Sequence, residues 1–254
     1  MPSKWSNRFE LKPGRWVYVP TPEARSDGAD IKRRISALWE PPEYYYHAQR
    51  GGHVAAIRSH LENSRFVRFD IQDFFGSINR TRVTRCLKSL VPYSTARAWA
   101  TASTVRDPLF RSKAHIPYGF VQSQLLASIC LFRSALGKYL HRIHGRHGIL
   151  VSVYVDDVIV SARDTDELEM VYAEIQIASA RSKLILSPSK STAPAAQVSA
   201  FNILLSEASM SINPERLAAF SAALAAGSSD SQRIGILRYV ESVCPQQLGV
   251  LETQ

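Results

Sequence analysis

The sequence predicts an α+β fold in which an antiparallel sheet is backed by helices on one face. The first observation is the order of the expected elements from residue 51 onward, which runs helix, strand, helix, hairpin, helix and strand. The second is VSVYVDDVIVSA at residues 151–162, where a pair of aspartates separates two β-branched apolar runs, a pattern typical of a tight hairpin. The third is an apolar stripe at helical spacing along residues 123–143.

The elements before the hairpin differ in how clearly the sequence marks them. The first 50 residues are rich in aromatic, proline and basic side chains, and we expect little regular structure there beyond a short helix over residues 31–38. Val54, Ile57 and Leu61 recur at helical spacing, and the alternation in RFVRFDIQDFF, residues 65–75, predicts a strand. A helix should therefore lead into a strand.

The remaining segments alternate between helical and extended patterns. Residues 80–111 are amphipathic and helical, and one long helix is expected over residues 123–143, with Ser123 as its cap. Residues 164–183 predict a capped amphipathic helix, residues 184–206 an extended stretch, and the chain from Pro214 onward a small helical tail.

Composition limits the classes of function. The chain has 254 residues, 45% of them hydrophobic, and a net charge of +9, which favours a polyanionic partner, with nucleic acid ahead of a membrane surface. No apolar run approaches the roughly 20 residues of a spanning helix, and the N-terminus lacks the apolar core of a signal peptide, so we expect a cytoplasmic protein. The cysteines, Cys86, Cys130 and Cys244, have no CxxC spacing and are expected to be core thiols.

The aspartate pair at the predicted hairpin tip has two explanations. A solvated acidic turn would account for Asp156 and Asp157, because aspartates are common in turns. A divalent metal site would also account for them, and it needs a further carboxylate. Asp70, at the end of the preceding alternating run, is the candidate, although taken singly it reads equally well as a cap. Together the three acids would suit two cations about 4 Å apart, the arrangement that catalyses in-line phosphoryl transfer.

These segments resemble the motifs of the reverse transcriptase family, in the family's order. RFDIQDFFGSI resembles the first palm motif, IPYGFVQSQLLAS the second, VYVDDVIVSA with its YVDD the metal-binding third, and LILSPSKS the lysine-bearing fourth. FNILLSEASMSI is similar to the primer-grip hairpin. GGHVAAIRSHL and IGILRYVESVCPQQLGVL resemble the bacterial retron-like and defence-associated branch.

The resemblance implies a right-hand polymerase architecture without a ribonuclease H domain. The fingers are expected over residues 1–66. An RRM-like palm, an antiparallel sheet backed by helices, is expected over residues 67–212, with fingers helices inserted around residues 80–115. Residues 213–254 would form a vestigial helical thumb, too short to clamp a long duplex alone, so a noncoding RNA, a partner protein or self-association should assist it.

The same resemblance assigns the catalytic groups. Asp70 and Asp156 match the two invariant metal ligands, and Asp157 matches their less strictly required neighbour. Ile71 is expected to present its backbone carbonyl to the metal that accompanies the nucleotide. Lys190 matches the lysine that neutralises or protonates the leaving pyrophosphate, although by itself it reads as a solvated lysine.

The predicted nucleotide-binding residues lie in the first and second motifs. They are Asp73, Phe74, Phe75, Tyr118, Gly119 and Gln122. Phe75 matches the steric gate that excludes a 2′-hydroxyl, although without the motif it reads as a core aromatic. Two positions depart from the family pattern: Tyr118 stands where Gln is usual and Gln124 where Pro is common, which puts nucleotide selectivity and template contacts in question.

Basic residues of the predicted fingers are candidates for contacts with triphosphate or template phosphates. They are Lys32, Arg33, Arg34 and Arg50. His47, His53 and His60 have a spacing that matches no metal-ligand pattern, so we expect them to be structural or to face RNA.

The implied function is RNA-directed DNA synthesis by two-metal nucleotidyl transfer, with two Mg²⁺ ions, Mn²⁺ as a substitute, and dNTPs as substrates. The expected partners are an RNA template, in particular a dedicated noncoding RNA, and the nascent DNA. The expected setting is the bacterial cytoplasm, in antiviral defence. Two alternatives stay open: a palm-type ribonucleotide polymerase or primase, and a polymerase remnant that binds RNA without chemistry.

Overall fold

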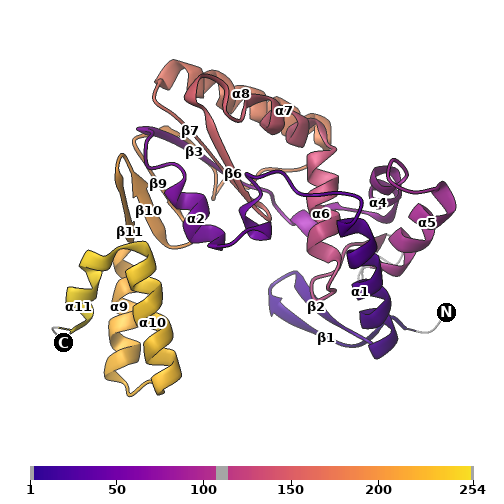
Figure 1. Cartoon of the computed structure of the whole chain (residues 1–254), viewed down its shortest axis with the longest axis horizontal. Coiled ribbons are helices and arrows are strands. Elements are labelled where there is room, and N and C mark those ends of the chain that lie inside the picture. The colour runs from indigo at the N-terminus through magenta and orange to yellow at the C-terminus, as the bar shows by residue number, and fades with distance from the viewer. Residues whose placement is uncertain (1–2, 107–113, 253–254) are drawn as a thin grey trace. The chain divides into compact units, whose positions relative to one another are not determined.

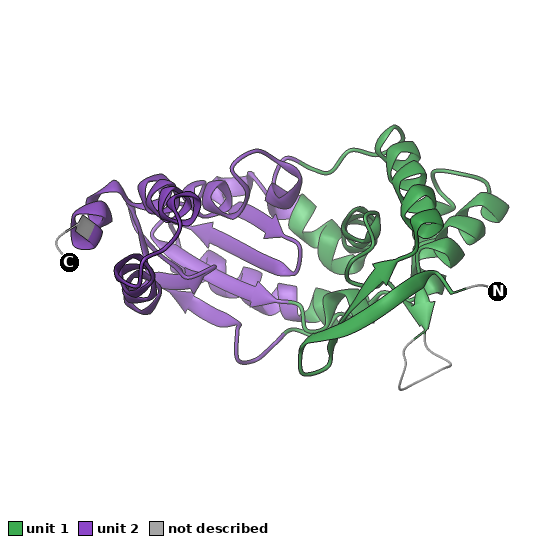
Figure 2. Ribbon diagram, turned by 90° about the horizontal axis from the view of Figure 1, so that it is seen from below, with its two compact units in different colours: residues 1–42, 71–141, 177–186 green, residues 43–70, 142–176, 187–254 purple. Residues whose placement is uncertain are grey.

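The structure is a computed structural model that describes residues 3–106 and 114–252. The chain forms two compact units that alternate along the sequence (Figure 2). Unit 1 comprises residues 1–42, 71–141 and 177–186, and unit 2 comprises residues 43–70, 142–176 and 187–254. The elements are labelled in Figure 1.

Unit 2 is built on a four-stranded sheet. Its strands, in spatial order, are β6 (Leu150–Tyr154), β7 (Asp157–Ala162), β3 (Arg65–Asp70) and β8 (Thr192–Ala195). All neighbouring strands are antiparallel, and β3 pairs with β7 from Arg65 opposite Ala162 to Asp70 opposite Asp157. The antiparallel sheet and the hairpin are therefore confirmed. The strand predicted over residues 65–75 is confirmed as far as Asp70, whereas Phe74–Ser77 is helical.

Both faces of this sheet are covered, whereas the sequence predicted helices on one face. Side chains alternate along a strand, so Phe69 points to one face, where its ring stacks on Tyr172 of α8 (Thr165–Ser182) with centroids 5.3 Å apart. Phe66 and Ile159 point to the other face and share a core cluster with Ile57 of α2 (Gly52–Arg58). These large apolar side chains require burial on that face as well.

A second, smaller sheet and the C-terminal helices complete the core of unit 2. Strands β9 (Gln197–Ala200), β10 (Ile203–Ser206) and β11 (Ser209–Ile212) form a sheet in the order β11-β10-β9. The helices that follow are α9 (Pro214–Ala225), α10 (Asp230–Val243) and α11 (Leu248–Glu252). The Gln247 side chain bonds both backbone groups of Ile212, at 2.7 and 2.9 Å, and ties this tail to β11. The predicted helical tail is confirmed.

His60 is buried beneath the main sheet of unit 2. Its Nδ1 lies 2.7 Å from the Ser161 hydroxyl and its Nε2 lies 2.8 Å from the Ser152 hydroxyl. Burial lowers the pKa of His60 to about 3, so the ring is neutral at physiological pH. His60 was expected either to be structural or to face RNA, and its burial supports the first of these roles.

We expect the stability of the fold to decrease as the pH falls below about 6.5, the pKa of His60 in the unfolded chain. Because the pKa of His60 in the folded protein is lower, at about 3, the unfolded state binds the proton first. The loss approaches about 1.4 kcal/mol for each pH unit between these two values. Urea unfolding at several pH values above 5 measures it, and His60→Gln should flatten the dependence. An identical slope in H60Q and wild type would contradict this account.

Unit 1 begins with a β-hairpin and a helix, so the expectation of sparse structure in the first 50 residues is wrong. Strands β1 (Trp5–Lys12) and β2 (Arg15–Pro20) are joined by a turn in which Gly14 has a φ of 77°. Helix α1 spans Pro22–Ser36, and the Thr21 hydroxyl caps it by accepting from the Ala24 N–H. Pro-Gly is a turn signal, and Thr-Pro-Glu is a helix-start signal. The predicted helix at 31–38 is thus the second half of a longer one.

The predicted helical segment 80–111 contains two helices rather than one. They are α4 (Arg80–Leu87) and α5 (Tyr93–Ala102). Pro92 precedes α5, and proline restricts both itself and the residue before it, which explains the interruption. After α5 the chain forms a short strand, β4 (Val105–Arg106), which pairs with β5 (Ala114–His115). The rest of the predicted segment, residues 107–111, lies outside the described residues.

The predicted helix over residues 123–143 is also divided. Helix α6 spans Ser123–Phe132 and α7 spans Ala135–Ile143. The Ser134 hydroxyl donates to the Leu131 carbonyl at 2.6 Å and accepts from the Gly137 N–H at 3.0 Å. Ser134 therefore caps the second helix, a role that the continuous apolar stripe concealed. Ser123 was expected to cap α6, but it is the first helical residue, after Gln122.

The remaining predictions about the core and the membrane can be checked in the described part of the chain. Cys86 and Cys130 are buried free thiols, as expected, and Cys244 is a free thiol that is only partly buried. Helix α8 is capped as predicted, since the Asp164 carboxylate accepts from the Glu167 N–H at 3.0 Å. Among the described residues, no helix has the length and apolar character needed to cross a membrane.

Candidate active site

The tip of the hairpin is Val155-Asp156, one residue earlier than predicted. Strand β6 ends at Tyr154 and β7 begins at Asp157, so Asp157 is a strand residue and Asp156 lies in the turn. Asp157 is fixed in the sheet because it pairs with Asp70 on β3 as well as with Tyr154 on β6. The register of three strands therefore overrides the local preference for a turn at the two aspartates.

The turn holds a strained backbone. Val155 has a φ of 60°, a left-handed conformation that is unfavourable for a β-branched residue. His47 supports it, because its Nδ1 accepts a hydrogen bond from the Val155 N–H at 3.0 Å. Burial lowers the pKa of His47 to about 4, which keeps the ring neutral and able to accept. Strain of this kind persists only where the surrounding structure holds it, and here it lies next to Asp156.

Asp70 and Asp157 meet directly across β3 and β7. They are opposite residues in the antiparallel register, so their side chains point to the same face of the sheet. The Asp70 side chain is 5% exposed and that of Asp157 is 14% exposed. Burial raises the pKa of Asp157, and the neighbouring charge of Asp70 adds to the effect, while Arg68 and Lys190 oppose it. Two buried carboxylates on opposite residues of paired strands repel each other, so they require cationic partners.

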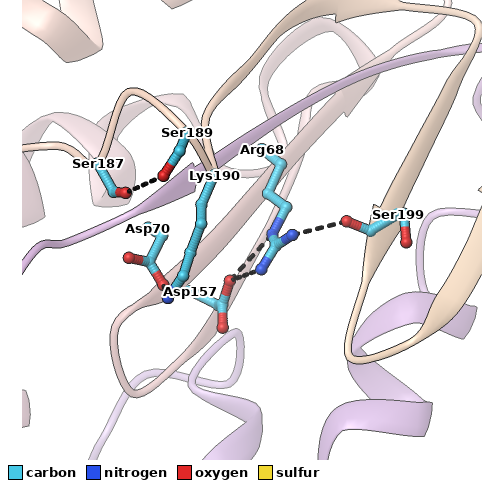
Figure 3. A network of polar contacts seen from close by, with 7 residues as sticks. All are labelled: Arg68, Asp70, Asp157, Ser187, Ser189, Lys190 and Ser199. Carbon is cyan, nitrogen blue, oxygen red and sulfur yellow. Dashed lines mark hydrogen bonds and ion pairs between the residues drawn. The ribbon is translucent and has the colours of Figure 1, made fainter. Parts of the chain in front are cut away.

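Lys190 is the cation beside Asp70. Its Nζ lies 2.9 Å from Asp70 Oδ2 (Figure 3). The turn that carries Lys190 is fixed to the same residue, because the Ser187 N–H donates to the Asp70 carbonyl at 2.8 Å and the Lys190 N–H donates to the Ser187 carbonyl at 3.2 Å. The fourth-motif lysine and the first-motif aspartate are therefore brought together, as their shared assignment to one site requires.

Arg68 is the cation beside Asp157, a role that the sequence motifs did not predict. Its Nε and Nη2 lie 3.0 and 2.6 Å from Asp157 Oδ1, and its Nη1 lies 2.7 Å from the Ser199 carbonyl oxygen (Figure 3). A signal was present in the strand pattern. Arg68 precedes Asp70 by two residues, so both side chains point to the same face of β3.

The chemistry of these side chains suits a divalent metal ion, since carboxylate oxygens are the ligands that Mg²⁺ prefers. In the arrangement described, Lys190 and Arg68 bind the carboxylates of Asp70 and Asp157. Within residues 3–106 and 114–252, no cluster of three or more His, Cys, Asp or Glu side chains is placed to hold a metal. Asp156, in the adjoining turn, is the nearest further carboxylate in the sequence.

Unit 1 brings together two predicted nucleotide-binding residues, Phe75 and Tyr118. Their ring centroids are 4.5 Å apart, and Phe75 is 8% exposed. The guanidinium of Arg15 lies 5.0 Å from the centroid of the Tyr118 ring, a cation–π contact that the sequence analysis did not anticipate. The Tyr118 carbonyl accepts from the Tyr18 N–H at 2.9 Å. Gly119 has a φ of 98° and passes so close to the Tyr18 carbonyl that a Cβ would not fit.

The other predicted nucleotide-binding residues occupy different environments. Asp73 is exposed, with a φ of 44°, and precedes the short helix α3 (Phe74–Ser77). Phe74 is buried. Gln122 is buried as well, and its amide donates to the Ser103 hydroxyl at 3.2 Å. Ile71, the predicted carbonyl ligand, is buried and forms a β-bridge with Leu186.

The basic residues proposed for phosphate contacts are exposed. Lys32, Arg33 and Arg34 lie on α1 in unit 1, whereas Arg50 lies in unit 2. Arg33 and Arg34 both form ion pairs with Asp30 on the same helix, with the Arg34 Nε at 2.7 Å. Exposed pairs of this kind are weak and leave the guanidinium groups accessible to another anion.

The fold of this chain is similar to those of solved telomerase and reverse transcriptase structures. A telomerase from Candida albicans, in complex with the TWJ fragment of telomeric RNA, matches with a TM-score of 0.57 and 9% identity over 94% of this chain and 53% of that one. The foamy viral protease-reverse transcriptase with double-stranded DNA matches with a TM-score of 0.50 and 16% identity over 91% of this chain and 34% of that one.

The family assignment follows from the sequence itself. The chain belongs to the reverse transcriptase (RNA-dependent DNA polymerase) family, which matches residues 15–220. A comparison with curated proteins finds no match. The chain spans 53% of the Candida albicans telomerase chain and 34% of the foamy viral chain.

Proposed function

We propose that this protein is an RNA-directed DNA polymerase. It would join the 3′-hydroxyl of a primer to the α-phosphate of a dNTP and release pyrophosphate. The observation that carries the proposal is the buried pair of Asp70 and Asp157, joined to Lys190, in a chain that belongs to the reverse transcriptase family. Phosphoryl transfer uses carboxylates that hold metal ions and a cation that neutralises the phosphates, and Asp70 and Lys190 are groups of these two kinds.

The chain's own residues would divide the work as follows. Asp70 and Asp156 would hold two divalent metal ions, with the Ile71 carbonyl as a further ligand. When bound, these ions lower the pKa of the attacking hydroxyl and neutralise charge on the phosphates. Lys190, whose side chain is 51% exposed, would leave Asp70 and neutralise or protonate the pyrophosphate.

The aromatic pair of unit 1 would select the sugar. Phe75 would lie beneath the deoxyribose, where its ring leaves no room for a 2′-hydroxyl. Tyr118 supports that ring from one side, with centroids 4.5 Å apart. Because Tyr118 has no amide, its contribution to nucleotide binding would be stacking rather than the bidentate hydrogen bonding that a Gln can offer.

Nucleotide addition to defined substrates separates this proposal from its rivals. The protein is incubated with Mg²⁺ and an oligo(dT) primer on poly(rA), and separately with unprimed poly(rA). Addition of dTMP to the primer, with little addition of UMP, is expected. Addition of UMP without a primer would identify a primase-like enzyme, and RNA binding without any addition would identify a polymerase remnant.

RNA binding should weaken steeply with salt, because the chain has 31 Lys and Arg against 22 Asp and Glu. Each phosphate that a basic side chain neutralises releases counterions, so the affinity for single-stranded RNA should fall by about 300-fold between roughly 50 and 200 mM salt for about six contacts. Fluorescence anisotropy with a labelled single-stranded RNA measures the effect. An affinity that is flat over this range would exclude an interface dominated by phosphate contacts.

We further propose that the template is a dedicated noncoding RNA and that the enzyme acts in bacterial antiviral defence, in the cytoplasm. The support is the likeness of GGHVAAIRSHL and IGILRYVESVCPQQLGVL to the retron-like and defence-associated branch, together with the +9 charge. Purification from bacterial cells followed by sequencing of the bound nucleic acid tests this. One enriched RNA and its complementary DNA are expected, whereas a random sample of cellular RNA would refute a dedicated template.

A further inference from the structure

Arg68 joins three strands of unit 2 through one guanidinium group. Two of its nitrogens, Nε and Nη2, bind Asp157 Oδ1 at 3.0 and 2.6 Å, and the third, Nη1, binds the Ser199 carbonyl at 2.7 Å. Arg68 lies on β3, Asp157 on β7 and Ser199 on β9. The planar fork of arginine is suited to such a fixed arrangement, which the point charge of a lysine cannot reproduce.

The ion pair between Arg68 and Asp157 differs from that between Lys190 and Asp70 (Figure 3). The side chains of Arg68 and Asp157 are 18% and 14% exposed, so water screens their attraction little. The Lys190 side chain is 51% exposed and forms one hydrogen bond to Asp70. Lys190 can therefore release its carboxylate at small cost, whereas Arg68 is held on both sides.

This difference assigns different roles to the two opposite carboxylates. A metal ion and a guanidinium compete for the same carboxylate oxygens. A guanidinium that is already fixed at hydrogen-bond distance neutralises the carboxylate and so weakens its attraction for a metal ion. We propose that Arg68 holds Asp157 through its Oδ1, between β3 and β9, and so keeps this carboxylate from binding the metal ions that the proposed function assigns to Asp70 and Asp156.

Arg68 is thus a positioning residue that acts through Asp157. The negative charge of Asp157, next to Asp70, would otherwise repel it or draw a metal ion away from it. With Arg68 in place, the charge of Asp157 is compensated by a buried cation. The charge of Asp70 is paired with the half-exposed Lys190, which can release it to a metal. This inference rests on the proposed polymerase function, because it concerns which residues of that site bind metal.

Mn²⁺ binding to the full chain, without nucleotide or nucleic acid, tests the assignment by isothermal titration calorimetry. Asp70→Asn and Asp156→Asn should each weaken Mn²⁺ binding by at least about tenfold, as loss of a ligand or its support does. Asp157→Asn should stay within about twofold of wild type, because asparagine keeps the acceptor for Arg68. Equal losses in D157N and D70N would overturn the inference while leaving the polymerase proposal intact.

Replacement of Arg68 provides a readout that a merely structural role would not move. In Arg68→Met the Asp157 carboxylate is released, so Mn²⁺ should bind more tightly or at an additional site, and adding Asp157→Asn should remove that gain. Arg68→Lys, which keeps the charge, should show a smaller gain. If Mn²⁺ binding to R68M does not respond to D157N, Arg68 does not mask Asp157 and the inference is wrong.

The inference about Arg68 can fail while the polymerase proposal stands, but the inference falls if the carboxylates bind no metal. If none of D70N, D156N and D157N alters Mn²⁺ binding, the carboxylates do not bind metal, and both the metal-dependent function and this inference fall. If R68M does not fold, the comparison of D157N with D70N and D156N still decides, because these three variants keep Arg68 and every side-chain volume close to the original.

Discussion

Replacing Asp70 or Asp156 with Asn is expected to lower nucleotide addition on a primed RNA template by at least about 10²-fold to 10³-fold, the usual effect of removing a preorganised electrostatic group. The physical reason is that each substitution removes a charged ligand from the ions that neutralise the transition state. Asn is nearly isosteric with Asp, so the fold should persist. Single-nucleotide addition under saturating dNTP measures the effect on the chemical step.

Asp164→Asn is the matched control for this prediction. Asp164 is an exposed aspartate that caps α8 by accepting from the Glu167 N–H, and asparagine caps a helix equally well. The D164N protein should therefore retain wild-type activity and melting temperature. Full activity in D70N or D156N would remove the chemical basis of the proposed function.

Replacing Phe75 with Val should allow ribonucleotides that the wild type rejects. If the ring discriminates by clashing with a 2′-hydroxyl, removing its outer atoms removes the clash and raises the ratio of ribonucleotide to deoxynucleotide addition, by tenfold for about each 1.4 kcal/mol of discrimination lost. Phe75 is 8% exposed and packs on Tyr118, so the variant will also be less stable. Replacing a buried Phe with Ala lowers the free energy of unfolding by about 3–5 kcal/mol, and Val should lower it by less.

Phe74→Leu separates selection from packing. Phe74, the neighbouring aromatic on α3, belongs to the predicted nucleotide-binding motif but is 2% exposed, so we expect it to act through packing. Its truncation should then lower the melting temperature without changing the ratio of the two sugars. The ratio and the melting temperature are measured for both variants. If F75V behaves like F74L, with a lower melting temperature and an unchanged ratio, Phe75 is a core residue rather than a gate.

The sequence predicted the parts of the fold that depend on local pattern. The strand that ends at Asp70 was marked by alternation, and the hairpin at residues 151–162 by two β-branched apolar runs; both elements are present. The N-terminal hairpin and α1 were also marked, by Pro-Gly at the turn and Thr-Pro-Glu at the helix start, but composition received more weight than these short signals. The break at Ser134 lay outside local prediction, since the apolar stripe continues through it.

The sequence motifs indicated the acidic residues and the lysine of the candidate site, but neither Arg68 nor the contacts among these side chains. The motifs placed Asp70 and Lys190 in one site, and the structure joins them at 2.9 Å. The position of Asp157 in a strand rather than in the turn depends on pairing with β3, which local turn preferences cannot supply. The contact of Arg68 with Asp157 follows from that register, so it emerges only when the strands are paired.

Sequencing the DNA made on an RNA of defined, mixed sequence is the most direct test of the central claim that this chain copies RNA into DNA. The purified protein is given the RNA, an annealed primer, four dNTPs and Mg²⁺, with D156N as the parallel control. We expect a product complementary to the RNA with wild type and none with D156N. A product whose sequence does not follow the RNA, or one that D156N makes equally well, would contradict the assignment.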